Sequence, residues 1–93
     1  MVTRSGRMLR MTSVNDVYVP RVIAAQLRFK GTGLFLGDKL AITDINGTPI
    51  ADHFVVNVNE DQPLIDNGRR IFCNGVKILS MPGGTCEVEF FLD

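Results

Sequence analysis

The stretch "GTGLFLGDKLAITDINGTPI", residues 31–50, constrains the fold more than any other part of the sequence. Within it, Leu40 and Ile42 alternate with small or polar residues, which is typical of a strand with one buried face. The Asn-Gly pair at 46–47 favours a turn with positive φ, so the strand should end there. The Gly-Asp pair at 37–38 should bend the chain into the strand. The stretch therefore predicts a strand at about 39–45 between two turns.

Three other segments have a local structural preference. In "TCEVEFFLD", residues 85–93, a period of two predicts a last strand whose buried face is formed by Cys86, Val88, Phe90 and Leu92. "NDVYVPRVI", residues 15–23, predicts another strand, which must lie at a sheet edge or end near Pro20 because proline donates no hydrogen bond. "AAQLRF", residues 24–29, favours one or two turns of helix. The sequence thus predicts an α+β fold, mostly β.

Composition limits the class of protein. The 93 residues suffice for a single domain, and 45% hydrophobic with 22% charged residues is a globular composition. Ten basic and ten acidic side chains cancel, so there is no overall attraction to nucleic acid. Basic residues gather in 1–30 and acidic ones in 38–66, which an ordinary solvated surface can explain. Neither a signal peptide nor a membrane-spanning run is evident, so we expect no membrane insertion and a cytoplasmic protein, or a domain of a larger one.

The residues that carry most enzyme chemistry are few. Cys73 and Cys86 lack the C-x-x-C spacing of metal or redox sites and are expected to be free thiols. His53, the only histidine, could activate either thiol only if the fold brought them together, and we expect it at the surface. The sequence has no metal-ligand cluster, phosphate-binding loop or paired catalytic carboxylates. We therefore predict no catalytic residues, no metal and no cofactor.

The order of these motifs resembles the PDZ domain family. Its core signature, G-x-L-x-x-G-D-x-I-L-x-V-N-G, is similar to the pattern formed here by Gly33, Leu34, Gly37, Asp38, Leu40, Ile45, Asn46 and Gly47. Downstream, "VKILSMPGGTCEVEF" resembles the family's final helix, its glycines and its last strand. The resemblance implies a single PDZ-like domain over residues 1–93, a partly open barrel or sandwich of five to six strands with a short and a longer helix. Residues at about 51–70 would be an insertion.

The resemblance also implies a function. A PDZ domain binds the C-terminal peptide of a partner by strand addition, in a groove between its second strand and last helix, as a scaffold, adaptor or signalling module. Carried over to this chain, the peptide-binding residues would be Gly6, Arg7, Met8, Leu9, Phe72, Val76 and Leu79. Phe72 has no hydrogen-bond donor, so the preferred ligand would have a hydrophobic C-terminus.

Two alternatives remain open at this point. "RRIFCNGVKILS", residues 69–80, consists of two β-prone runs separated by Asn-Gly, which favours a hairpin, whereas the family register favours a helix from Phe72. In "SGRML", Ser5 and Arg7 replace the apolar residues that the family uses around the peptide carboxylate. The alternative function is a structural domain or a homodimer, formed through an edge strand or the apolar Phe35. A regulatory domain separated from a protease is a third possibility.

Overall fold

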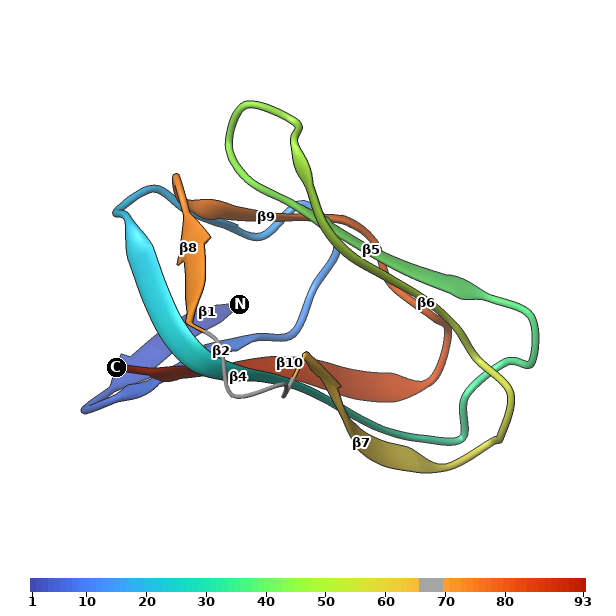
Figure 1. The fold of residues 1–93 in the computed structure, drawn as a ribbon. Coiled ribbons are helices and arrows are strands. Elements are labelled where there is room, and N and C mark those ends of the chain that lie inside the picture. The colour runs from blue at the N-terminus through green and yellow to red at the C-terminus, as the bar shows by residue number, and fades with distance from the viewer. Residues whose placement is uncertain (66–69) are drawn as a thin grey trace.

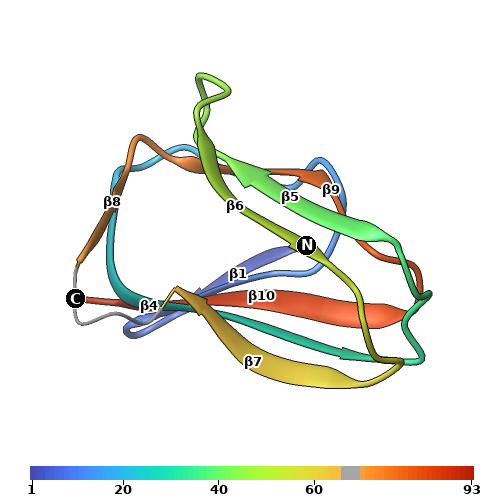
Figure 2. The same ribbon diagram turned by 45° about the vertical axis from the view of Figure 1, so that its right-hand side comes forward.

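The computed structural model describes residues 1–65 and 70–93, and these form two antiparallel β-sheets that pack face to face (Figure 1). The large sheet has the order β1 (Val2–Ser5), β2 (Met8–Met11), β10 (Thr85–Leu92), β4 (Val22–Thr32). Two further strands, β7 (Glu60–Ile65) and β8 (Ile71–Cys73), pair with different parts of the other edge of β4. The small sheet has the order β3 (Val17–Tyr18), β9 (Val76–Ser80), β5 (Lys39–Thr43), β6 (Pro49–Phe54). Figure 2 shows the two layers from a second side.

The hydrophobic core lies between the sheets, and both contribute to it. Leu40 and Ile42 of β5 and Val88 and Phe90 of β10 are completely buried. The alternation along each strand turns these side chains inward, where removal of apolar surface from water stabilises the fold by about 25 cal/mol per Å². The strands predicted from "KLAITDI" and "TCEVEFFLD" are thus confirmed, as is the predicted place of Pro20, because β3 is an edge strand that ends two residues before it.

The predicted α+β class is wrong, because the described residues form ten strands and no helix. None of them therefore belongs to a helix that could cross a membrane. The segment "AAQLRF" lies inside β4, which pairs with β10 along its length. In this segment the buried residue after Ala24 is Leu27, three positions on, because the register of strand pairing is irregular in this part of β4. The irregularity interrupts the period of two. The residues there are good helix formers, so the local sequence favours a helix where the structure has a strand.

The segment around Asn74 and Gly75 is neither the expected helix nor a hairpin. β8 pairs with β4 in the large sheet, whereas β9 pairs with β3 and β5 in the small one. The Asn-Gly turn, with Gly75 at φ 75°, therefore carries the chain from one sheet to the other. Asn-Gly signals a reversal through positive φ, but it does not determine that the flanking strands pair with each other.

The expected insertion at 51–70 is largely part of the sandwich. β6 and β7 begin and end within or close to it. The segment "NEDQP", residues 59–63, has a composition typical of an exposed acidic loop, but it lies mostly in β7. Glu60 in this strand is buried. Residues 66–69 of the expected insertion lie outside the described residues. The expected PDZ-like sandwich of five to six strands with an insertion is therefore wrong. The chain forms two sheets, and this segment supplies strands to them.

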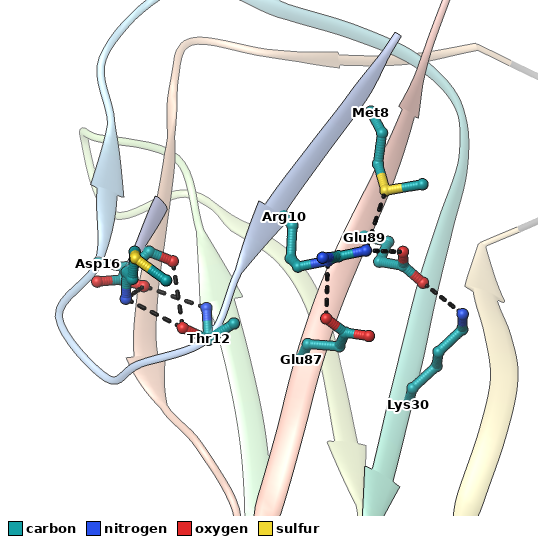
Figure 3. A network of polar contacts seen from close by, with 8 residues as sticks. Met8, Arg10, Thr12, Asp16, Lys30, Glu87 and Glu89 are labelled. Carbon is teal, nitrogen blue, oxygen red and sulfur yellow. Dashed lines mark hydrogen bonds and ion pairs between the residues drawn. The ribbon is translucent and has the colours of Figure 1, made fainter. Parts of the chain in front are cut away.

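Cross-strand ion pairs lie on the face of the large sheet that points away from the core. They neutralise several of the charged side chains that the sequence distributes unevenly. Figure 3 shows Arg10 between Glu87 and Glu89, with Nε 2.8 Å from Oε2 of Glu87, and Lys30 Nζ 3.0 Å from Oε1 of Glu89. The Glu89 side chain is only 1% exposed, which makes its two basic neighbours necessary. Arg28 joins the two oppositely charged parts of the sequence, with Nε 2.8 Å from Oδ1 of Asp61.

Both cysteines are free thiols, as the sequence predicts. Burial raises the pKa of Cys73 and Cys86, and the charge of Asp44 raises that of Cys73 further. Since the thiolate is the reactive form, both should be alkylated slowly by iodoacetamide in the native state at about pH 8 and rapidly in urea. Mass spectrometry of a labelling time course checks this, with Cys73→Ser to assign the sites. Rapid native labelling of Cys73 would contradict the burial described here.

Candidate functional site

Three loops meet at one end of the sandwich, the end away from the C-terminus in Figures 1 and 2. They are the β4–β5 loop (33–38), the β6–β7 loop (55–59) and the β9–β10 loop (81–84). The first two loops and the end of β6 carry large apolar side chains that point into solvent. We call this set the apolar tip; it consists of Phe35, Leu36, Phe54, Val56 and Val58.

Main-chain hydrogen bonds hold the first two of these loops together. Leu34 N–H donates to the carbonyl of Val58 at 2.8 Å, and Gly37 N–H donates to the carbonyl of Val55 at 3.0 Å. Val55 N–H returns a bond to the carbonyl of Asp38 at 2.9 Å. The apolar side chains between these bonds are thus presented on a backbone that is already ordered, which lowers the entropic cost of binding.

The β9–β10 loop is attached to the same end by two more bonds. Phe35 N–H donates to the carbonyl of Gly83 at 3.3 Å, and Gly83 N–H donates to Oδ2 of Asp38 at 2.9 Å. Asp38 lies in the turn before β5, but its carboxylate binds a loop 45 residues away. The Phe35 ring lies against Gly83, where a Cβ would be 2.8 Å from Cδ2 of the ring. This fixes one side of the ring and leaves the other to solvent.

The side chains of the apolar tip are unusually exposed for apolar residues. The relative exposure is 64% for Phe35 and for Leu36, and 67% for Val56. The segments "GLFLG" at 33–37 and "FVVNV" at 54–58 contain no ionisable residue. Single exposed apolar side chains are ordinary, but several on adjoining loops mark a surface that binds something.

Two opposite charges at the margin of the tip are paired with each other. Lys39 Nζ lies 3.5 Å from Oδ2 of Asp52 and 5.6 Å from the centroid of the Phe54 ring. The cation therefore rests over the aromatic ring at the margin of the tip. A partner that covers the tip does not have to supply a compensating charge at this position.

A buried carboxylate supports the β6–β7 loop from below. Glu60 Oε2 accepts hydrogen bonds from Val56 N–H at 2.9 Å and Asn57 N–H at 3.3 Å, and Oε1 lies 2.7 Å from His53 Nε2. Gln62 Nε2 donates to the same Oε1. Burial acts to raise the pKa of Glu60, but the hydrogen bonds from Val56, His53 and Asn57 outweigh it and hold the pKa below its usual value of 4.5. Glu60 thus orders the loop that carries two residues of the tip.

His53 is not the surface residue that the sequence suggests. Its side chain is 17% exposed, it pairs with Glu60, and its ring centroid lies 5.6 Å from that of Phe29. Its ring nitrogen contacts the side chains of Glu60 and Gln62, and neither is a nucleophile. The histidine is therefore used to hold a loop in place.

The structure does not bring the predicted peptide-binding residues together. Gly6 and Arg7 form the exposed turn between β1 and β2, and Met8 and Leu9 follow in β2, with Leu9 completely buried. β2 pairs with β1 on one side and with β10 on the other, so its edges are occupied. An added peptide strand has no place beside β2.

The three predicted helix residues lie on two different sheets. Phe72 is on β8 of the large sheet and points outward, Val76 on β9 of the small sheet is completely buried, and Leu79 on β9 is exposed. The expected register put all three on one face of a helix, whereas the strand alternation separates Val76 from Leu79. No groove with a helical wall exists among the described residues.

Part of the apolar tip could be recognised from the sequence. Phe35 and Leu36 lie between Gly33 and Gly37, which adopt φ values of 62° and 86° and mark a tight loop. The alternation of Phe54, Val56 and Val58 favours an extension of the sheet, although β6 ends at Phe54. Comparison with known proteins found no matching family model, no similar curated protein and no similar solved structure.

Proposed function

We propose that the chain is a structural interaction module that associates with a second copy of itself through the apolar tip. The observation that carries the proposal is the cluster of apolar side chains on loops joined by main-chain hydrogen bonds. Covering Phe35, Leu36 and Val56 removes apolar surface from water without ordering a flexible segment. This function needs no covalent chemistry.

Charge supports a second copy as the partner. The formal net charge is zero at pH 7, so two copies do not repel each other at long range. The segments 33–37 and 54–58 are uncharged, and Lys39 and Asp52 at the margin neutralise each other. In a two-fold dimer the same patch meets itself, and an uncharged apolar patch is complementary to itself.

The edge of the small sheet is continuous with the apolar tip and supports the same arrangement. Among the described residues, β6 pairs with β5 only, so its other edge is open. Its last residue, Phe54, belongs to the tip and is 59% exposed. A partner seated on the tip would therefore also lie beside backbone groups that can accept another strand.

The binding of a C-terminal peptide in a helix-walled groove is not retained in this proposal. That mode requires a free strand edge next to a helix, and β2 is enclosed between β1 and β10. The alternative expected from the degenerate "SGRML" segment, a domain that associates without binding a carboxylate, agrees better with the fold.

The test compares two matched double variants by sedimentation velocity over about a hundred-fold range of concentration. The first double variant, Phe35→Ser with Leu36→Ser, removes part of the tip, where both residues are 64% exposed. The second, Phe72→Ser with Leu79→Ser, removes a similarly exposed pair elsewhere, with exposures of 69% and 47%. We expect the wild type and the second variant to dimerise and the first to remain monomeric. All four side chains are exposed, so both variants should fold, which circular dichroism verifies.

Two results would overturn the proposal. One is a wild-type chain that sediments as a monomer over the whole range. The other is a dimer that the Phe72 and Leu79 substitutions abolish and the Phe35 and Leu36 substitutions leave intact, since the interface would then lie away from the tip.

A further inference from the structure

A small hollow lies at the end of the sandwich opposite the apolar tip. The β1–β2 turn and the C-terminus lie at this end, as Figure 1 shows. The volume of the hollow is about 170 Å³. Arg4 from β1, Tyr18 from β3 and Arg21 from the segment before β4 line it, together with Val22, Ile23, Leu92 and Asp93. Three elements that are distant in the sequence thus direct polar groups to one place.

The two arginines of the hollow differ from three other arginines that the structure describes. Arg10, Arg28 and Arg70 each form an ion pair with an acidic side chain. Within residues 1–65 and 70–93, no ion pair is formed by Arg4 or Arg21, and both are exposed. Two guanidinium groups around one hollow repel each other unless an anion lies between them.

The Tyr18 hydroxyl and the apolar residues of the hollow favour an anion as well. Arg4 Nη1 donates a hydrogen bond to the hydroxyl oxygen of Tyr18 at 2.7 Å, so the hydroxyl proton of Tyr18 remains available for a ligand. Asp93 also lines the hollow, but its Oδ2 lies 2.6 Å from Nε of Arg70 and is paired there. Ile23 and Leu92 also line the hollow and are apolar, which strengthens electrostatic attraction beside them.

We propose that this hollow, which we call the arginine hollow (Arg4, Tyr18 and Arg21), binds a phosphate group. A phosphate dianion matches two guanidinium charges and accepts several hydrogen bonds, and arginine forks bind its oxygens in pairs. The Tyr18 hydroxyl supplies one further donor. Phosphate as a free ion and phosphate in an ester share this chemistry. The site is independent of the apolar tip, which lies at the other end of the molecule.

The experiment is a titration of the ¹⁵N-labelled chain at constant ionic strength, followed by amide chemical shifts. The probes are inorganic phosphate and phenyl phosphate, with sodium chloride as the control salt. We expect saturable shifts at residues 21–23 and 92–93 with both phosphates and none with chloride. Stronger binding of phenyl phosphate would assign the site to an ester with an apolar substituent, and equal binding would assign it to the phosphate group alone.

Variants separate a built site from general attraction to positive charge. Arg4→Gln and Arg21→Gln should each weaken phosphate binding by about tenfold, and Tyr18→Phe by a smaller factor. The control, Arg28→Gln, removes the same charge from the outer face of the large sheet and should leave the affinity unchanged. Lowering the pH from about 7.5 to about 5 converts the dianion to the monoanion and should weaken binding to the wild type.

Shifts that increase linearly without saturation would overturn the proposal. So would an Arg28→Gln variant that weakens binding as much as Arg4→Gln, since binding would then depend only on net charge. The arginine side chains are exposed, and thermal melting monitors the fold of each variant, so a loss of binding is not confused with unfolding.

Discussion

The variant Gly75→Ala should unfold at a much lower urea concentration than the wild-type chain. Gly75 has φ 75°, and a Cβ at this position would lie 2.7 Å from the carbonyl oxygen of Tyr18 and 2.9 Å from that of Val19. Both are backbone atoms that cannot move without shifting β3. The left-handed conformation costs an alanine about 1–2 kcal/mol, and the steric conflict adds to this cost.

The matched control is Gly47→Ala. Gly47 has φ 89° in the turn after β5, and no atom lies within 4 Å of a Cβ built there. This variant should lose only the conformational term, so the difference between the two free energies of unfolding measures the crowding at Gly75. Equal losses would contradict the close packing of the turn that carries the chain from the large sheet to the small one.

Strands whose pattern is local could be predicted from the sequence. The alternation of Leu40 with Ile42 and of Val88 with Phe90 is uninterrupted, and both pairs are in the core. Pro20 lacks a donor, so it correctly limited β3 to an edge. In these segments the local preference and the final burial agree, and no information from distant residues is required.

Features that depend on distant partners could not be predicted. The irregularity in β4 follows from pairing with β10 and β7, so the step from Ala24 to Leu27 has no local signal. Asn74 and Gly75 mark a turn correctly, but the sheet that each flanking strand joins is decided by long-range pairing. The resemblance to PDZ domains rested on turn residues such as Asn46 and Gly47, which many folds use.

The candidate surface was only partly visible for the same reason. Phe35 stands out in the sequence because it lies between two glycines in a loop. Its neighbour Val56 comes from another loop, and the two loops meet through bonds such as Leu34 N–H to the Val58 carbonyl. The arginine hollow likewise combines Arg4 and Arg21, which are adjacent only in the fold.

The variant Glu60→Ala should lower the free energy of unfolding by about 3 kcal/mol, because it removes a buried acceptor. Two amide groups, those of Val56 and Asn57, lose their bond to Oε2, and His53 loses its bond to Oε1. The control is Asp61→Ala in the next position, whose exposed ion pair with Arg28 should contribute less than about 1 kcal/mol. Urea unfolding at pH 7 compares the two, and a loss as small as that of Asp61→Ala would contradict the role assigned to Glu60.

The pH dependence of stability provides a second test of Glu60. Its pKa in the folded state is lower than the usual 4.5, so its contribution is complete above about pH 4.5 and is lost as the pH falls through the lowered value. The difference in unfolding free energy between the wild type and Glu60→Ala should therefore be constant near neutral pH and shrink in acid. The Asp16 carboxyl also has a lowered pKa, but it is present in both proteins and cancels in the difference. Because Glu60 orders the backbone beneath Val56, dimerisation of the wild type should weaken over the same acid range. If the Glu60→Ala variant dimerised as strongly as the wild type, the apolar tip would not depend on Glu60.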